Sequence, residues 1–180
     1  MNAEPVTSSS APSPTASLIG VSFPMTVGDI LYLEPGIRTF AFNVVLNDKN
    51  KPVPAAIETA NRIGILGLEI RPEIGMIFKP DESMSFGFSV APSVILRFPI
   101  VATGSAGATE MNTVRDYYFS KARYFNIYGG AFFGYSFYEN LDFKVKLGTN
   151  FPVYHLWDGE QIAFYDQLLI TPEIALVWRP

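Results

Sequence analysis

Nine charged residues stand at alternating positions within otherwise apolar stretches, and such a set can pair ions, conduct them or transfer protons. They are Glu34, Arg38, Glu69, Arg71, Glu73, Arg97, Lys144, Lys146 and Glu173. With Lys79, Asp142 and Arg179 on the same faces, five acidic side chains stand against seven basic ones. Because an unpaired buried charge is costly, a nearly balanced set predicts a network of paired ions that fills an interior. The functional alternative is a narrow or gated ion path, since a wide pore selecting one sign would be lined unequally.

Other chemistry is largely excluded by composition. The 180 residues include no cysteine, which excludes disulfides, thiolate zinc sites and a cysteine nucleophile. A single histidine, His155, leaves almost no room for a histidine-based metal cluster. Thirteen basic against seventeen acidic residues give a net charge of −4, which is unlike a nucleic-acid-binding surface. We therefore expect no metal, no cofactor and no nucleic-acid partner.

The elements that position these charges are predicted to be β-strands. In residues 66–79 every even position is apolar, whereas odd positions include Glu69, Arg71 and Glu73, and a strand points these two sets to opposite faces. The same alternation occurs in five further segments, and more weakly in a sixth: 31–41, 86–100, 125–137, 141–153 and 168–178, with 19–25 the weaker one. The apolar faces of the six stronger segments hold 41 positions and no charged residue. At the overall charge content of 17%, roughly seven charged residues would be expected there by chance.

Three observations indicate that the apolar faces point outward, into lipid. Each pattern lasts for about 11 to 16 residues, whereas globular strands average about 5 or 6 and a tilted membrane strand needs about 9 to 11. The polar faces mix charges with Gly, Ser and Ala, as suits a crowded interior. Bulky aromatic residues mark the ends of the apolar faces, as in the girdles at water–lipid boundaries. These residues are Phe78, Phe86, Phe98, Phe125, Phe137, Phe151 and Trp178.

The links between the strands alternate in length: short at 26–29, 79–83 and 139–140, long at 47–61, 101–123 and 155–167. With these features, residues 18–180 resemble the small bacterial outer-membrane β-barrel proteins, the eight-stranded OmpA/OmpX/OmpW-like class. The resemblance implies an all-β fold, an antiparallel transmembrane β-barrel with short periplasmic turns and longer outer loops. Seven strands are visible, and single-chain bacterial barrels have an even number. We therefore expect eight when complete, with a first strand and a signal peptide upstream of Met1; the alternative is an odd-stranded barrel closed by one parallel pair.

The resemblance also sets the expected role. Residues 1–17, rich in Ser, Thr and Pro, are expected to be an unstructured remnant of an outer loop, and 18–180 the barrel. We expect a monomer in the outer membrane of a diderm bacterium, with a polar packed lumen. Its role would be to act through extracellular loops or to stabilise the envelope. Loop 101–123, which ends in Tyr117, Tyr118 and Phe119, is the best candidate for contacts with external ligands or host molecules.

Two alternatives remain. The first is an OmpW-like narrow channel for small or apolar molecules, indicated only by four aromatic residues on the polar faces: Tyr32, Phe40, Tyr128 and Phe132. The second is a soluble lipocalin-like ligand-binding barrel, which would carry the apolar faces inside and the charges outside.

Some eight-stranded barrels are lipid A deacylases or acyltransferases, so His155 must be considered as a catalytic residue. A hydrolase triad needs a nucleophile and an orienting carboxylate beside the imidazole. Asp158 and Glu160 follow closely, but Trp157 stands where a deacylase-like His-x-Ser pairing would place the serine. Ser120, in another loop, is only a remote candidate for the nucleophile. We therefore expect no enzymatic activity. On the outward register near the outer rim of its strand, His155 is interpreted as an interfacial anchor.

Overall fold

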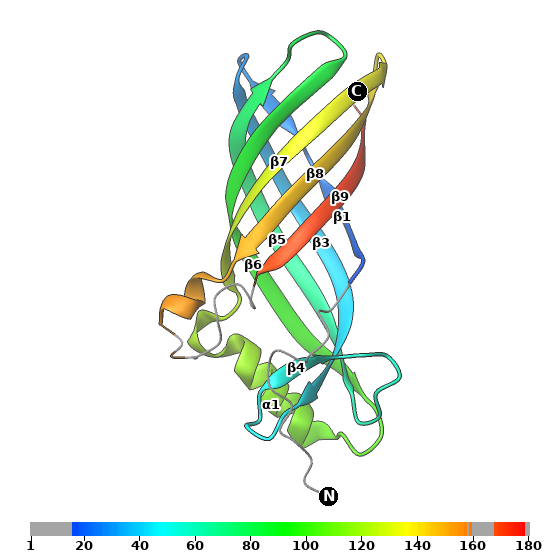
Figure 1. The fold of residues 1–180 in the computed structure, drawn as a ribbon, viewed down its shortest axis with the longest axis vertical. Coiled ribbons are helices and arrows are strands. Elements are labelled where there is room, and N and C mark those ends of the chain that lie inside the picture. The colour runs from blue at the N-terminus through cyan, green and yellow to red at the C-terminus, as the bar shows by residue number, and fades with distance from the viewer. Residues whose placement is uncertain (1–15, 158, 160–167, 179–180) are drawn as a thin grey trace, which may run out of the picture. The chain divides into compact units, whose positions relative to one another are not determined.

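The computed structural model describes residues 16–178 except 158 and 160–167, and this part of the chain is built mainly of antiparallel β-strands. Seven of its nine strands follow one another across a curled, half-barrel sheet (Figure 1). In sheet order they are β1 (Leu18–Ser22), β3 (Leu31–Leu46), β5 (Ile63–Phe78), β6 (Met84–Ala102), β7 (Phe125–Tyr138), β8 (Leu141–Phe151) and β9 (Leu169–Trp178). The all-β, antiparallel prediction with seven principal strands is confirmed.

Two short strands were not expected as separate elements. β2 (Met25–Val27) and β4 (Pro52–Ala55) each pair with β3. The weak alternation at 19–25 divides into β1 and β2 at Pro24, which has no N–H group to donate to a neighbouring strand. The adjacent Phe23 N–H keeps one bond to the sheet, to the Pro35 carbonyl at 3.0 Å.

Two of the three long links, 47–61 and 101–123, contain helices or strands of their own. Link 47–61 includes β4, and link 101–123 folds into α1 (Ala108–Phe119) and a 3-10 turn, η2 (Ser120–Ala122). The Glu110 carboxylate accepts a hydrogen bond from the Gly107 N–H at 2.9 Å, which satisfies one free donor at the start of α1. No helix in the described part of the chain has the length and apolar character needed to cross a membrane.

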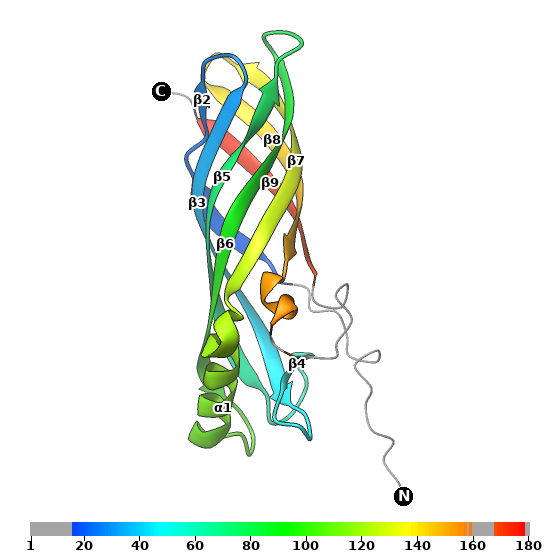
Figure 2. The same ribbon diagram turned by 90° about the vertical axis from the view of Figure 1, so that its left-hand side faces the viewer.

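The described residues form two compact units, and β3, β5 and β6 each contribute to both. The first unit holds 16–19, 38–69 and 95–124; the second holds 20–37, 70–94 and the described residues from 125 onward. In the first unit α1 packs on β3 and β5 (Figure 2). Its fully buried Val114 meets Val44, Ile63 and Ile65, so these strands turn an apolar surface toward the helix.

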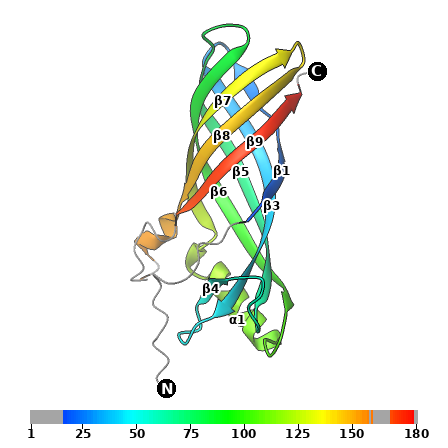
Figure 3. The same ribbon diagram turned by 45° about the vertical axis from the view of Figure 1, so that its right-hand side comes forward.

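In the second unit, β6, β7, β8 and β9 pair in sequence order as antiparallel neighbours. Met84–Val94 of β6 pairs with Phe125–Tyr135 of β7, and β7, β8 and β9 lie side by side (Figures 1 and 3). The β5–β6 turn is closed by Asp81, whose carboxylate accepts hydrogen bonds from the Ser83 hydroxyl and the Ser83 and Met84 N–H groups at 2.7–2.8 Å. These bonds, the one from the Ser83 hydroxyl foremost, hold the pKa of Asp81 below its usual value.

Candidate functional site

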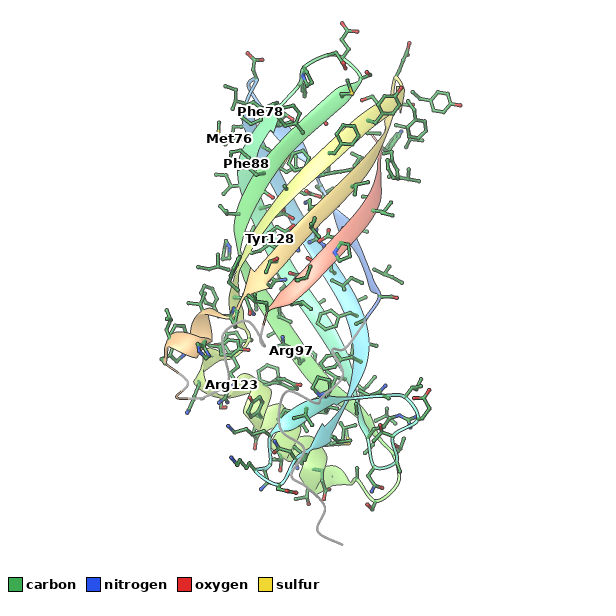
Figure 4. All side chains as sticks on the ribbon, viewed as in Figure 1. Met76, Phe78, Phe88, Arg97, Arg123 and Tyr128 are labelled. Atoms are coloured by element: carbon green, nitrogen blue, oxygen red, sulfur yellow. The ribbon has the colours of Figure 1, made fainter. Side chains whose placement is uncertain are left out.

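The second unit carries its charges on the inner face of the sheet and its large apolar side chains on the outer face. Glu34, Arg71 and Lys146 are at most 6% exposed, whereas Ile74 and Val145 on the same strands are 49% and 40% exposed. Met76, Phe78 and Phe88 point outward from the sheet (Figure 4). A soluble sheet that buries one face shows the opposite polarity.

Lys146 lies at the centre of the buried charges. Its Nζ is 2.9 Å from both carboxylate oxygens of Glu73 and also pairs with Glu34. Lys144 Nζ lies 2.8 Å from the same Glu34. Arg71 extends the chain of ion pairs, with Nε 2.9 Å from Glu73 and Nη2 2.6 Å from Glu173. We call these residues the ionic network: Glu34, Arg71, Glu73, Lys144, Lys146 and Glu173. Three carboxylates thus meet three cations, and the network is formally neutral.

Hydroxyl groups and aromatic rings complete the network. The Ser22 hydroxyl donates to Glu34 at 2.6 Å, and the Ser89 hydroxyl donates to Glu73. The Tyr32 hydroxyl bonds with both Glu34 and Lys144. The Arg71 guanidinium lies 3.6 Å from the centre of the Tyr128 ring. Every principal strand supplies either a member of the ionic network or a side chain that contacts one. The members come from β3 (Glu34), β5 (Arg71), β8 (Lys146) and β9 (Glu173), and the contacting side chains from β1 (Ser22), β6 (Ser89) and β7 (Tyr128).

The other three candidate charges belong to the first unit. Arg38 and Glu69 are buried there. Arg97 is half-buried, with its guanidinium 5.2 Å from the ring centre of Tyr118 on α1 (Figure 4). The structure therefore joins six of the nine candidate residues through ion pairs in one unit and places three in the other.

Six of the seven predicted interfacial aromatics are exposed, and Phe125 is half-buried. Phe78 and Phe86 stack with their ring centres 5.5 Å apart. The placement of His155 on a strand was wrong: β8 ends at Phe151, and His155 lies half-buried in the short 3-10 helix η3 (Val153–Leu156). The helix forms because Pro152 cannot continue the strand's hydrogen bonding, and the His155 N–H donates to the Pro152 carbonyl at 3.0 Å. Asp158 and Glu160 lie outside the described residues.

The inner face of the sheet is filled by rings that occupy the space above glycines. Tyr32, Phe40, Tyr128 and Phe132 are all buried. A Cβ added at Gly130 or Gly148 would overlap the Tyr128 ring, and one at Gly67 would overlap Phe40. Small and large residues are therefore matched across the interior, as close packing requires.

This packing predicts different effects for two adjacent glycines of β7. Gly130→Ala is expected to lower the free energy of unfolding by about 1–3 kcal/mol, because Tyr128 is fully buried beneath Arg71 and has no room to move. Gly129→Ala is the matched control, since its Cβ would meet only Phe151 at an ordinary 3.8 Å. Urea titration of both variants measures the difference. Equal effects would show that Tyr128 is not tightly enclosed.

The described residues hold no group of three His, Asp or Glu side chains placed to bind a metal ion. Comparison of the chain with protein-family models, with curated proteins and with solved structures gives no match. The function must therefore be inferred from the geometry.

Proposed function

We propose that this chain is a membrane-spanning β-barrel protein of a bacterial outer membrane, with a closed interior and with the loops and helix of its first unit as an external contact surface. The observation that supports this most strongly is the inverted polarity of the second unit. Its outward faces present residues such as Ile74, Phe88 and Val145 at 40–52% exposure, around a buried ionic network. Only an apolar solvent makes that arrangement favourable over so many strands.

The spacing of the aromatic residues supports the same conclusion. Phe143 and Phe151 on β8 are separated by eight residues, about 27 Å along a strand and about 20 Å across a membrane at a typical tilt. That is close to the apolar band of about 25 Å found in membrane barrels. At one end of β8, Tyr135 of β7 pairs with Phe143 and Trp178 of β9 pairs with Leu141. At the other end, the exposed Leu156 and Trp157 follow Phe151. Both boundaries of the band therefore carry aromatic side chains.

A closed interior is preferred over a channel because the ionic network is neutral and internally paired. Lys146 pairs with Glu34 and Glu73, and Arg71 pairs with Glu73 and Glu173. Little charge therefore remains to attract a permeating ion. The rings of Tyr32 and Phe132, with centres 4.7 Å apart, add apolar packing to the network. A protein of this kind would act through its external segments.

Cysteine labelling tests the proposal, because the chain contains no cysteine of its own. In phosphatidylcholine vesicles we expect Ile74→Cys to be protected from a water-soluble maleimide, although Ile74 is 49% exposed in the protein alone. Lys49→Cys, in the exposed β3–β4 turn, is the control and should react rapidly. Both variants should react fully once unfolded in urea.

Equal reaction of the two cysteines in vesicles would contradict membrane insertion. Recordings across a planar bilayer test the closed interior separately. We expect no discrete conductance steps from the unaltered chain, and regular steps would favour the channel alternative.

A further inference from the structure

Three aromatic rings gather where α1 ends against β6, within the first unit. The ring of Phe119 has its centre 5.6 Å from that of Phe98 and 6.4 Å from that of Tyr124. Phe98 and Phe119 are each more than one third exposed. Along β6, Phe98 shares its face with Ile100, which is also exposed. We call Phe98, Phe119 and Tyr124 the aromatic patch.

The turn that follows Phe119 is held in one conformation. The Arg123 guanidinium donates to the Ser120 hydroxyl at 2.6 Å and to the Tyr117 carbonyl at 3.1 Å, and it lies 4.1 Å from the centre of the Tyr117 ring. Lys121 and Ala122 have φ angles of 51° and 53°, in the left-handed region that non-glycine residues rarely adopt. Lys121 is exposed, so the buried Arg123 fixes the turn that presents it.

The charge of this unit is complementary to an anionic partner. Among its described residues, eight basic side chains stand against five acidic ones, whereas the described part of the second unit has four basic and eight acidic. Among the described residues, the excess of positive charge is therefore confined to the unit that carries the aromatic patch.

We propose that the aromatic patch and Lys121 bind the headgroup region of an anionic phospholipid; this rests on the membrane insertion argued above. Aromatic rings favour the boundary between headgroups and acyl chains, and an adjacent ammonium group attracts a lipid phosphate. A soluble anion would engage Lys121 but would gain nothing from the exposed rings of Phe98 and Phe119. The mixture of one cation with apolar rings therefore selects a lipid.

Fluorescence quenching by brominated lipids tests this site. Phe119→Trp, made with Trp157→Phe and Trp178→Phe, places the only indole in the patch. In phosphatidylcholine vesicles containing a minority of brominated lipid, brominated phosphatidylglycerol is expected to quench this indole about twofold more than brominated phosphatidylcholine. Adding Lys121→Gln should remove the preference. Lys49→Gln, which removes an exposed cation of the same unit outside the patch, should leave it unchanged.

Equal quenching by the two lipids, or a preference that survives Lys121→Gln, would overturn the proposal. The preference should also be measured in inorganic phosphate and in sodium chloride of equal ionic strength. A larger loss of preference in phosphate would assign the site to soluble anions and would also overturn the proposal. Quenching of Trp157 and Trp178 in the unaltered chain distinguishes failure of membrane insertion from failure of the lipid site. If neither brominated lipid quenches the two tryptophans of the unaltered chain, the proposed membrane insertion is wrong. If both lipids quench those tryptophans equally and the indole at position 119 shows no preference, only the proposed lipid site is wrong.

Discussion

Lys146→Met is expected to lower the free energy of unfolding by about 3 kcal/mol, among the largest effects of any single substitution in this chain. Lys146 is the cation shared by Glu34 and Glu73, and all three side chains are at most 4% exposed. Its removal leaves the ionic network with one uncompensated negative charge in a space that water does not reach. Removing one partner of a buried ion pair lowers the free energy of unfolding by about 3–5 kcal/mol. The lower value applies here because Glu34 still pairs with Lys144 and Glu73 still pairs with Arg71.

Urea titration followed by tryptophan fluorescence measures this effect, with a double variant and an exposed pair as controls. Lys146→Met combined with Glu34→Gln restores neutrality, so it should cost less than the sum of the single changes by at least about 1 kcal/mol. Arg115→Met breaks the pair of Arg115 with Asp116, whose side chains are 54% and 71% exposed, and should cost below about 1 kcal/mol. Equal costs for Lys146→Met and Arg115→Met would mean that water reaches the network.

The composition of the ionic network follows from the sequence, but its pairing does not. Alternation along a strand is fixed by covalent geometry, so Glu69, Arg71 and Glu73 had to share one face. Which cation meets which carboxylate depends on the curl of the sheet. Glu34 on β3 meets Lys144 on β8, although these strands stand four places apart in the sheet. Serine gives no pattern of its own, so the hydroxyl donors Ser22 and Ser89 were not anticipated.

The segments that the sequence did not reveal have weak periodic patterns. In β4, Pro52 and Pro54 lack the backbone N–H groups that a strand normally donates. The segment is a strand because these residues pair with Leu46 and Val44 of β3. Helix α1 buries only Val114 completely, so its apolar stripe is narrow. Its local signal is the Gly107–Glu110 cap, so tertiary contacts of Val114 with Ile63 and Ile65 contribute most of the stability of the helix.

Val145→Arg is expected to lower the free energy of unfolding by about 2–4 kcal/mol when the protein is in lipid vesicles. Val145 lies opposite Phe133 of β7 and Ile174 of β9, in the middle of β8, and all three side chains are exposed. Under the proposed insertion this position meets the centre of the bilayer, where a guanidinium loses most of its hydration. Unfolding by urea in vesicles, followed by intrinsic fluorescence, gives the difference from the unaltered chain.

Tyr138→Arg is the matched control, because it places the same side chain on an exposed site at the end of a strand. Tyr138 precedes the Glu139–Asn140 turn and is 68% exposed, so an arginine there would reach the headgroups and cost about 0–1 kcal/mol. In water both sites would tolerate arginine within about 0.5 kcal/mol, since neither is buried in the protein. The difference between the two variants therefore reports the solvent at the outer face of β8. Equal costs at the two sites would mean that this face meets water, and the membrane assignment would fall with it.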